Sequence, residues 1–215
     1  MRLPYFAIPC SLVIAAGGFW LMHVSSSAKT AGASQYSIPS RHPVTKEMEA
    51  AAASLRRTPV PSFMLVDQDS NQVGTPNLKT GKPSVLFFIK EGCPCSIEAQ
   101  PLFNNVAKAF GGDAHFFGVI DAEPKVASLY AQANVVTFPI ICDPKKGLPT
   151  SFKMTASASI ALVDGSGSIV KAWPGYNRDV LRQLNFLLGT LSKAGPKEFD
   201  DSDAPTELTA GCAFF

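Results

Sequence analysis

The chain has 215 residues, of which 46% are hydrophobic and 17% are charged, and its formal net charge is +2. That length supports one ordinary hydrophobic core with a tail at each end. Lysines and arginines are adjacent only in pairs, such as Arg56-Arg57 and Lys145-Lys146, so no basic patch of the kind that binds nucleic acid is expected. The five cysteines are too few and too unevenly spaced for the disulfide framework of a small secreted domain.

An uncharged and mostly apolar segment lies near the start of the chain, at residues 5–22, with Arg2 before it. Its length falls between the apolar region of a cleaved signal peptide and a full membrane span. Residues 1–28 are therefore predicted to be either a signal peptide or a retained membrane anchor. Both possibilities place the following domain outside the cytoplasm, either held at the cell membrane and facing the periplasm or exterior, or released to the periplasm.

After this segment the composition changes twice. Residues 29–58 are rich in Ala, Ser, Thr and Pro, which predicts a linker with a short helical stretch at 46–57. From residue 59 to residue 191 apolar strand-like runs alternate with amphipathic stretches. Strands are predicted at residues 62–66, around 73, and at 84–89, 114–120, 137–142, 159–163 and 169–172; helices are predicted at 97–110, 124–133, 148–154 and 177–191. Residues 192–215 form a C-terminal tail.

This order of elements predicts the fold class. The run Ser84 to Ile89, SVLFFI, is continuously apolar, as expected of a central strand covered on both faces. The last two predicted strands flank the turn residues of 164–167, which is typical of a hairpin. Strands that alternate with helices, followed by a hairpin and a last helix, predict an α/β three-layer sandwich with a mixed sheet.

The candidate chemistry lies in the turn Gly92-Cys93-Pro94-Cys95-Ser96, between the central strand and the next helix. Backbone N–H groups at a helix N-terminus are unpaired, and the helix dipole favours negative charge there. A Cys93 thiolate is therefore stabilised, which makes Cys93 the candidate catalytic nucleophile. The alternative is that Cys93 and Cys95 simply fill a turn.

The spacing of the two cysteines leaves two interpretations of Cys95. Residues three apart share a helix face and residues two apart do not, so Ser96 rather than Cys95 is the helical neighbour of Cys93. A disulfide between Cys93 and Cys95 would be strained and easily reduced. Otherwise Cys95 is a small buried side chain below the turn.

The run from Val85 to Ser96, with Glu98 and Pro101 in the helix, resembles the redoxin (AhpC/TSA, thioredoxin-like) superfamily, in particular its membrane-anchored bacterial members. The segments FPIICDP at 138–144 and IALVDG at 160–165 are similar to redoxin segments as well. The resemblance covers about residues 59–191 and implies a thioredoxin-like fold. Its implications for activity are broader, because the superfamily includes thiol-disulfide oxidoreductases, peroxidases and domains that have lost both activities.

Three features depart from the family pattern near Cys93. Ala158 stands where the resemblance places the cis-proline of thioredoxins, and the arginine that peroxiredoxins carry in that neighbourhood is missing. Lys90 replaces the threonine that helps peroxiredoxins to orient peroxide. We expect Lys90 to favour the Cys93 thiolate electrostatically, and we group Lys90, Pro94, Ser96 and Ala158 as residues that support the site.

A second thiol could come from the tail, which ends in the apolar segment 208–215 containing Cys212. About 20 extended residues can span roughly 65 Å, more than the width of about 35 Å expected for such a domain. Cys212 is therefore a possible resolving cysteine, the alternative being a disordered end. Cys142 lies in an apolar strand and is expected to be structural. None of the three histidines lies near Cys93 in the sequence, so no metal site and no cofactor are expected.

The leading functional prediction is an extracytoplasmic thiol-disulfide redoxin. Its Cys93 would attack a disulfide or an oxidant, and Cys95, Cys212 or an external reducing thiol would release it. The expected partners are a protein or small-molecule disulfide or peroxide, a reducing thiol, and the membrane through residues 5–22. A thiol-dependent peroxidase is the first alternative. A non-catalytic, anchored thioredoxin-fold interaction domain is the second, and the departures at Ala158 and at the missing arginine favour it.

Overall fold

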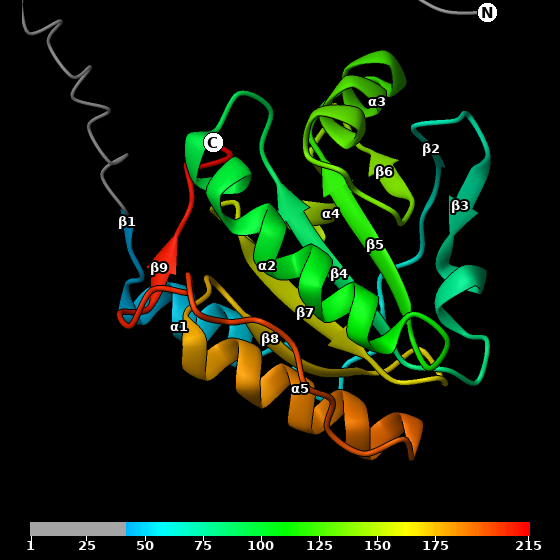
Figure 1. Cartoon of the computed structure of the whole chain (residues 1–215). Coiled ribbons are helices and arrows are strands. Elements are labelled where there is room, and N and C mark those ends of the chain that lie inside the picture. The colour runs from blue at the N-terminus through cyan, green and yellow to red at the C-terminus, as the bar shows by residue number, and fades with distance from the viewer. Residues whose placement is uncertain (1–41) are drawn as a thin grey trace, which may run out of the picture. The chain divides into compact units, whose positions relative to one another are not determined.

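The structure is a computed structural model and describes residues 42–215 (Figure 1). Its elements in chain order are β1 (His42–Pro43), α1 (Lys46–Ala53), β2 (Met64–Asp67), β3 (Gln72–Gly74), the 3-10 helix η1 (Thr75–Leu78), β4 (Ser84–Ile89), α2 (Pro94–Phe110), β5 (His115–Ile120), α3 (Pro124–Ala133), β6 (Ile140–Cys142), α4 (Gly147–Ser151), β7 (Ser159–Val163), β8 (Ile169–Trp173), α5 (Arg178–Ser192) and β9 (Thr209–Ala210). The predicted segments at 84–89, 124–133 and 159–163 are confirmed at those bounds.

A seven-stranded mixed sheet forms the centre of the fold, in the order β3-β2-β6-β5-β4-β7-β8. Strand β4 pairs in parallel with β5 and antiparallel with β7, and all six of its residues are buried. Its apolar run needs no alternation because both faces of the strand are covered. The predicted α/β class with a mixed central sheet is confirmed.

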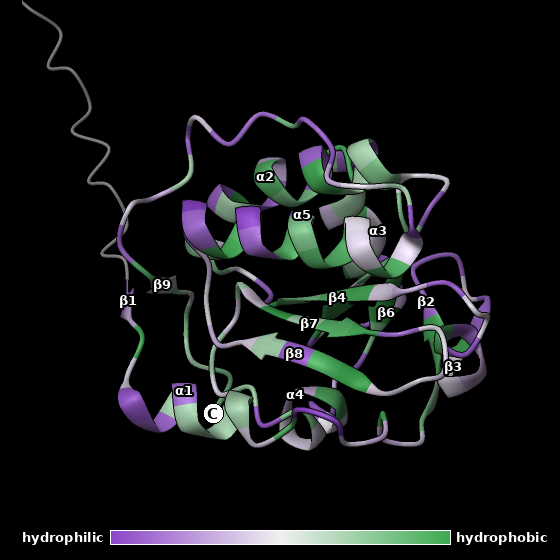
Figure 2. Ribbon diagram, turned by 90° about the horizontal axis from the view of Figure 1, so that it is seen from below, coloured by the Kyte–Doolittle hydropathy of each residue, from purple (hydrophilic) through white to green (hydrophobic). Residues whose placement is uncertain are grey.

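Helices cover both faces of the sheet, which gives three layers (Figure 2). On one face, Phe87 of β4 packs in a buried cluster with Phe103 of α2 and Leu184 of α5. On the other face, Phe88 packs in a second cluster with Phe152, which follows α4. Adjacent residues of β4 thus point into different clusters, as expected of a strand whose side chains alternate between two buried faces.

Segments on both sides of residues 59–191 also pack on the sheet. Ala52 of α1 and Leu55 lie in the same buried cluster as Phe88, although the sequence places them in a linker. At the other end of the chain, Ala204 is buried in the α2 and α5 cluster and Phe214 in the α1 and α4 cluster. The tail therefore adds apolar contacts to both faces of the sandwich.

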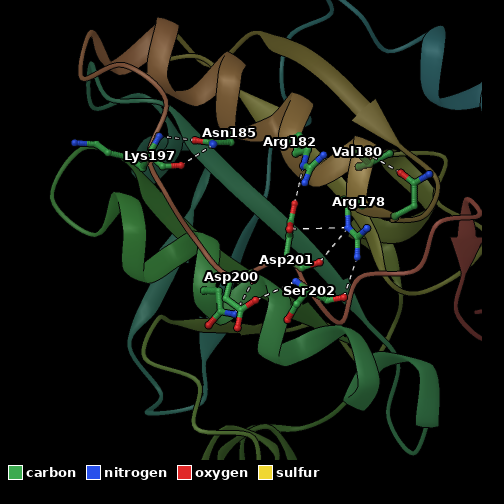
Figure 3. A network of polar contacts seen from close by, with 10 residues as sticks. Arg178, Val180, Arg182, Asn185, Lys197, Asp200, Asp201 and Ser202 are labelled. Atoms are coloured by element: carbon green, nitrogen blue, oxygen red, sulfur yellow. Dashed lines mark hydrogen bonds and ion pairs between the residues drawn. The ribbon is translucent and has the colours of Figure 1, made fainter.

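Polar contacts hold the first half of the tail against α5 (Figure 3). Arg182 donates to the Asp201 carboxylate at 2.7 Å, and Arg178 donates to the Ser202 carbonyl at 2.9 Å. Further along the helix, Asn185 and the backbone of Lys197 form two mutual hydrogen bonds, at 2.7 and 2.8 Å. The tail thus runs back along α5 towards β9, which pairs with β1.

The predicted signal peptide or anchor at residues 1–28, with its apolar segment 5–22, lies outside the described residues. Within residues 42–215 no helix combines the length and the apolar character needed to cross a membrane.

Candidate active site

Cys93 occupies the N-cap position of α2, where the chain leaves the carboxyl end of β4. Gly92 precedes it with φ at +66°, a backbone conformation that glycine adopts without steric cost. Pro94 follows at the first helical position, where its missing N–H is not needed. This turn fixes Cys93 at the helix N-terminus, as the sequence predicts, and its side chain is only 2% exposed.

Two donors outside α2 reach the Cys93 sulfur. The backbone N–H of Cys212 donates to Cys93 Sγ at 3.2 Å, and the Ser157 hydroxyl donates at 3.4 Å. Burial disfavours the thiolate, but hydrogen bonds from the Cys212 side chain, from Ser157, and from the backbone amides of Cys212 and Ser96 outweigh it and lower the pKa of Cys93 to about 7. A substantial fraction of Cys93 is thus ionised near neutral pH.

The Cys95 side chain is buried one residue into α2. Burial raises the pKa of Cys95 to about 12, and the neighbouring Cys93 and Cys212 add to the increase. All four cysteines in residues 42–215 are free thiols. At neutral pH Cys95 is therefore a protonated thiol and a poor nucleophile.

The remaining predicted residues lie around the turn with different contacts. Ser96 is buried, and its hydroxyl oxygen accepts from the backbone N–H of Lys90 at 3.2 Å. The Lys90 ammonium lies 3.8 Å from the Asp121 carboxylate. Its charge acts on Cys212, where it partly offsets the burial that raises the pKa of that thiol. Lys90 thus acts electrostatically on the thiol of Cys212.

Ala158 adjoins the site through the backbone. It has φ at +58°, and its N–H donates to the Phe88 carbonyl of β4 at 2.7 Å. This contact ties the start of β7 to β4 and places the preceding residue, Ser157, beside Cys93. The predicted supporting position is therefore adjacent to a side chain that touches the sulfur.

The end of the tail lies over Cys93 and pairs with the segment before β7. Gly211 N–H donates to the Ser157 carbonyl at 2.8 Å, and Ser157 N–H donates to the Cys212 carbonyl at 3.0 Å. A side chain at position 211 would overlap the Ser157 hydroxyl, so only glycine allows this approach. Farther along, Phe214 N–H donates to the Thr155 carbonyl at 2.8 Å. These contacts bring Cys212 to Cys93, and the chain end lies beside the first turn of α2 (Figure 1).

Tyr130 of α3 supports the first turn of α2 from behind. Its hydroxyl lies 3.2 Å from the Ser96 carbonyl oxygen and 3.1 Å from the side-chain oxygen of the buried Gln100. Burial raises the pKa of Tyr130, so the hydroxyl stays protonated as a donor. Cys142 is remote from this chemistry: it is buried in β6, and burial raises its pKa to about 11.

Residues 57–172 match the AhpC/TSA family. The chain belongs to the AhpC/TSA family. The matched range includes Cys93, Cys95 and Ser157, whereas Cys212 lies beyond it. Membership of the AhpC/TSA family supports an oxidoreductase or thiol peroxidase activity. No curated protein matches the chain.

Solved structures similar to this AhpC/TSA protein share its thioredoxin-like fold. A DsbE thiol:disulfide interchange protein from Chlorobium tepidum has a TM-score of 0.58 at 19% identity, over 64% of this chain and 97% of that one. The exposed lipoprotein thioredoxin Etrx1 from Streptococcus pneumoniae has a TM-score of 0.51 at 21% identity, over 62% of this chain and 99% of that one. The peroxidoxin BcpB from Mycobacterium tuberculosis has a TM-score of 0.53 at 18% identity, over 65% of this chain and 96% of that one. The predicted thioredoxin-like fold is thereby confirmed.

Proposed function

We propose that this protein is a thiol-disulfide oxidoreductase in which Cys93 is the nucleophile and Cys212 is the resolving cysteine. The observation that carries the proposal is the hydrogen bond of 3.2 Å from the Cys212 amide to Cys93 Sγ. Because of this hydrogen bond, Cys212, which carries the second thiol, already lies beside Cys93. The lowered pKa of Cys93, about 7, supports its role as the attacking group.

The exchange proceeds in two displacements. The Cys93 thiolate attacks one sulfur of a partner disulfide, the partner's S–S bond breaks, and its other sulfur leaves as a thiolate. Cys212 gives its proton to that thiolate and attacks Cys93 Sγ, which releases the second partner thiol. The protein then holds a disulfide between Cys93 and Cys212, while the partner has gained two electrons, one proton from Cys212 and one proton from water. An external dithiol returns the protein to the reduced state.

Cys212 suits the resolving role better than Cys95 does. Cys95 is 2% exposed and its pKa is raised to about 12, so it rarely becomes a thiolate and no external thiol reaches it readily. Cys212 is only partly buried. An external reductant can thus attack the proposed disulfide at the Cys212 sulfur.

Peptide mapping after mild oxidation tests this pairing. Reduced protein treated with diamide and digested without reductant is expected to yield a cross-linked peptide pair containing Cys93 and Cys212. The variant Cys142→Ser serves as control and should give the same pair, because Cys142 is buried in β6. A predominant link between Cys93 and Cys95, or no internal link at all, would contradict the assignment of Cys212.

A thiol peroxidase is the second candidate, and one observation favours it. Cys93 is 2% exposed beneath the tail, a setting that admits a small peroxide more easily than a protein disulfide. In that reaction the Cys93 thiolate would attack peroxide and become a sulfenic acid as hydroxide leaves. The Cys212 thiol would then attack the Cys93 sulfur, and the sulfenic hydroxyl would take the Cys212 proton and leave as water, which forms the same disulfide.

We also propose that the domain works outside the cytoplasm. The apolar segment 5–22 supports this location, as does the likeness to an exposed lipoprotein thioredoxin, and protein disulfides persist in oxidising compartments. The full chain expressed in a bacterium with two membranes is expected in the membrane or periplasmic fraction. A variant without residues 1–28 should stay in the cytosol, and recovery of the full chain from the cytosol would refute the location.

A further inference from the structure

Three metal-binding side chains meet beside the nucleophile. A ring nitrogen of His42, the Cys95 sulfur and the Cys212 sulfur all lie within 4.8 Å of one another. These residues come from β1, from the first turn of α2 and from the tail, so they are far apart in the sequence. The grouping arises only when all three elements pack together.

Separate contacts fix the backbone of each of these three residues. His42 in β1 pairs with Ala210 in β9, two residues before Cys212, so strand pairing places the histidine next to the end of the tail. The tail is fixed in turn by the backbone pairing of Gly211 and Cys212 with Ser157. Cys95 is fixed by its position in the α2 helix. The fold therefore sets the backbone positions of all three residues.

The donor set is chemically specific. Two cysteine sulfurs and one imidazole nitrogen are ligands of Zn²⁺, which binds such sets in tetrahedral geometry with a fourth position left for water. Ligand atoms in a tetrahedral zinc site of this kind lie about 3.3 to 3.8 Å apart, so these three need to approach by no more than roughly 1 to 1.5 Å. His42 is exposed and lines a surface pocket together with Gly211, so the histidine side of the site is open to solvent.

We propose that His42, Cys95 and Cys212 bind one Zn²⁺ ion when the protein is reduced. Binding displaces the thiol protons of the two cysteines. The site itself does not depend on the proposed oxidoreductase activity, because Cys93 is not one of its ligands. It shares Cys212 with that activity, however, so a disulfide at Cys212 and a zinc ion exclude one another.

Zinc titration of the reduced full chain against a chromogenic chelator tests the site. One Zn²⁺ per chain is expected, and Co²⁺ in its place should show cobalt–thiolate absorption. His42→Ala and Cys212→Ser should each weaken the affinity at least about tenfold, since each removes one of three ligands. The matched control is His115→Ala, because the ring of that histidine contacts Thr80 away from the site.

Several results would overturn the proposal. They are the absence of stoichiometric zinc binding, an unchanged affinity in His42→Ala, and an equal loss of affinity in His115→Ala. A site that keeps its affinity in His42→Ala but loses it in Cys212→Ser would consist of thiols alone and would also refute the three-ligand assignment. His42 is exposed, so its replacement is not expected to unfold the chain, and circular dichroism of each variant checks this.

Discussion

Replacing Cys93 with serine should abolish disulfide exchange while leaving the fold intact. A serine hydroxyl stays protonated at neutral pH, whereas the pKa of Cys93 is lowered to about 7, so the variant has no nucleophile. The serine oxygen still accepts hydrogen bonds from the Cys212 amide and Ser157, which preserves the local packing. Insulin reduction driven by dithiothreitol is expected to fall at least about a thousandfold.

Insulin reduction and peroxide consumption, measured on the same variants, separate the candidate functions. Cys142→Ser should keep at least half of the wild-type rate and thus control for loss of a thiol as such. A Cys93-dependent consumption of hydrogen peroxide with a thiol donor, without insulin reduction, would favour the peroxidase. If the wild-type protein is inactive with both substrates, or if Cys93→Ser keeps its activity, the catalytic proposal fails and an interaction domain is the better description.

Replacing Phe214 with alanine should release the tail from Cys93. Phe214 is 1% exposed in the core cluster of α1 and α4, and truncating a buried phenylalanine costs about 3–5 kcal/mol. Because the tail after α5 contributes no strand to the seven-stranded sheet, it can undock locally without unfolding of that sheet. We expect Cys93 to react with iodoacetamide at least about tenfold faster in the variant, as measured by mass spectrometry of the digested protein.

The next residue provides a matched control. Phe215 is 71% exposed, so Phe215→Ala should leave the Cys93 alkylation rate unchanged. Equal rates for Phe214→Ala and the wild-type protein would show that the tail does not limit access to the sulfur. Hydrogen exchange at residues 209–214 gives an independent readout, since undocking exposes the Gly211 and Phe214 amides that pair with the segment before β7.

The turn that carries Cys93 was predictable because its signals are local. A continuous apolar run identifies β4, and the run from Gly92 to Ser96 identifies the turn before the next helix. The helix was predicted from residue 97, whereas α2 begins three residues earlier, at Pro94. A cysteine between that strand and the next helix must then lie at the helix N-terminus, as Cys93 does. The mixed sheet was predictable for the same reason, since each strand has its own apolar pattern and its own turn residues.

The contacts across the site were not predictable from local patterns. The sequence shows that the tail can reach Cys93, but its docking depends on Gly211 meeting Ser157, a fit between two backbones that leaves no periodic signal. His42 lies in a segment that composition assigns to a linker, and its partners are in α2 and the tail. Tyr130 acts from an ordinary helix, where a tyrosine is usually core packing.

The pairing of Gly211 and Cys212 with Ser157 also affects how another polypeptide approaches. Ser157 offers one N–H and one C=O beside the reactive sulfur, and the protein's own final residues already use both. An extended guest chain that pairs with this edge must compete with a tethered strand, whose local concentration is of millimolar order. A polypeptide that displaces Gly211 and Cys212 from Ser157 must therefore gain binding free energy from strong contacts elsewhere on the surface.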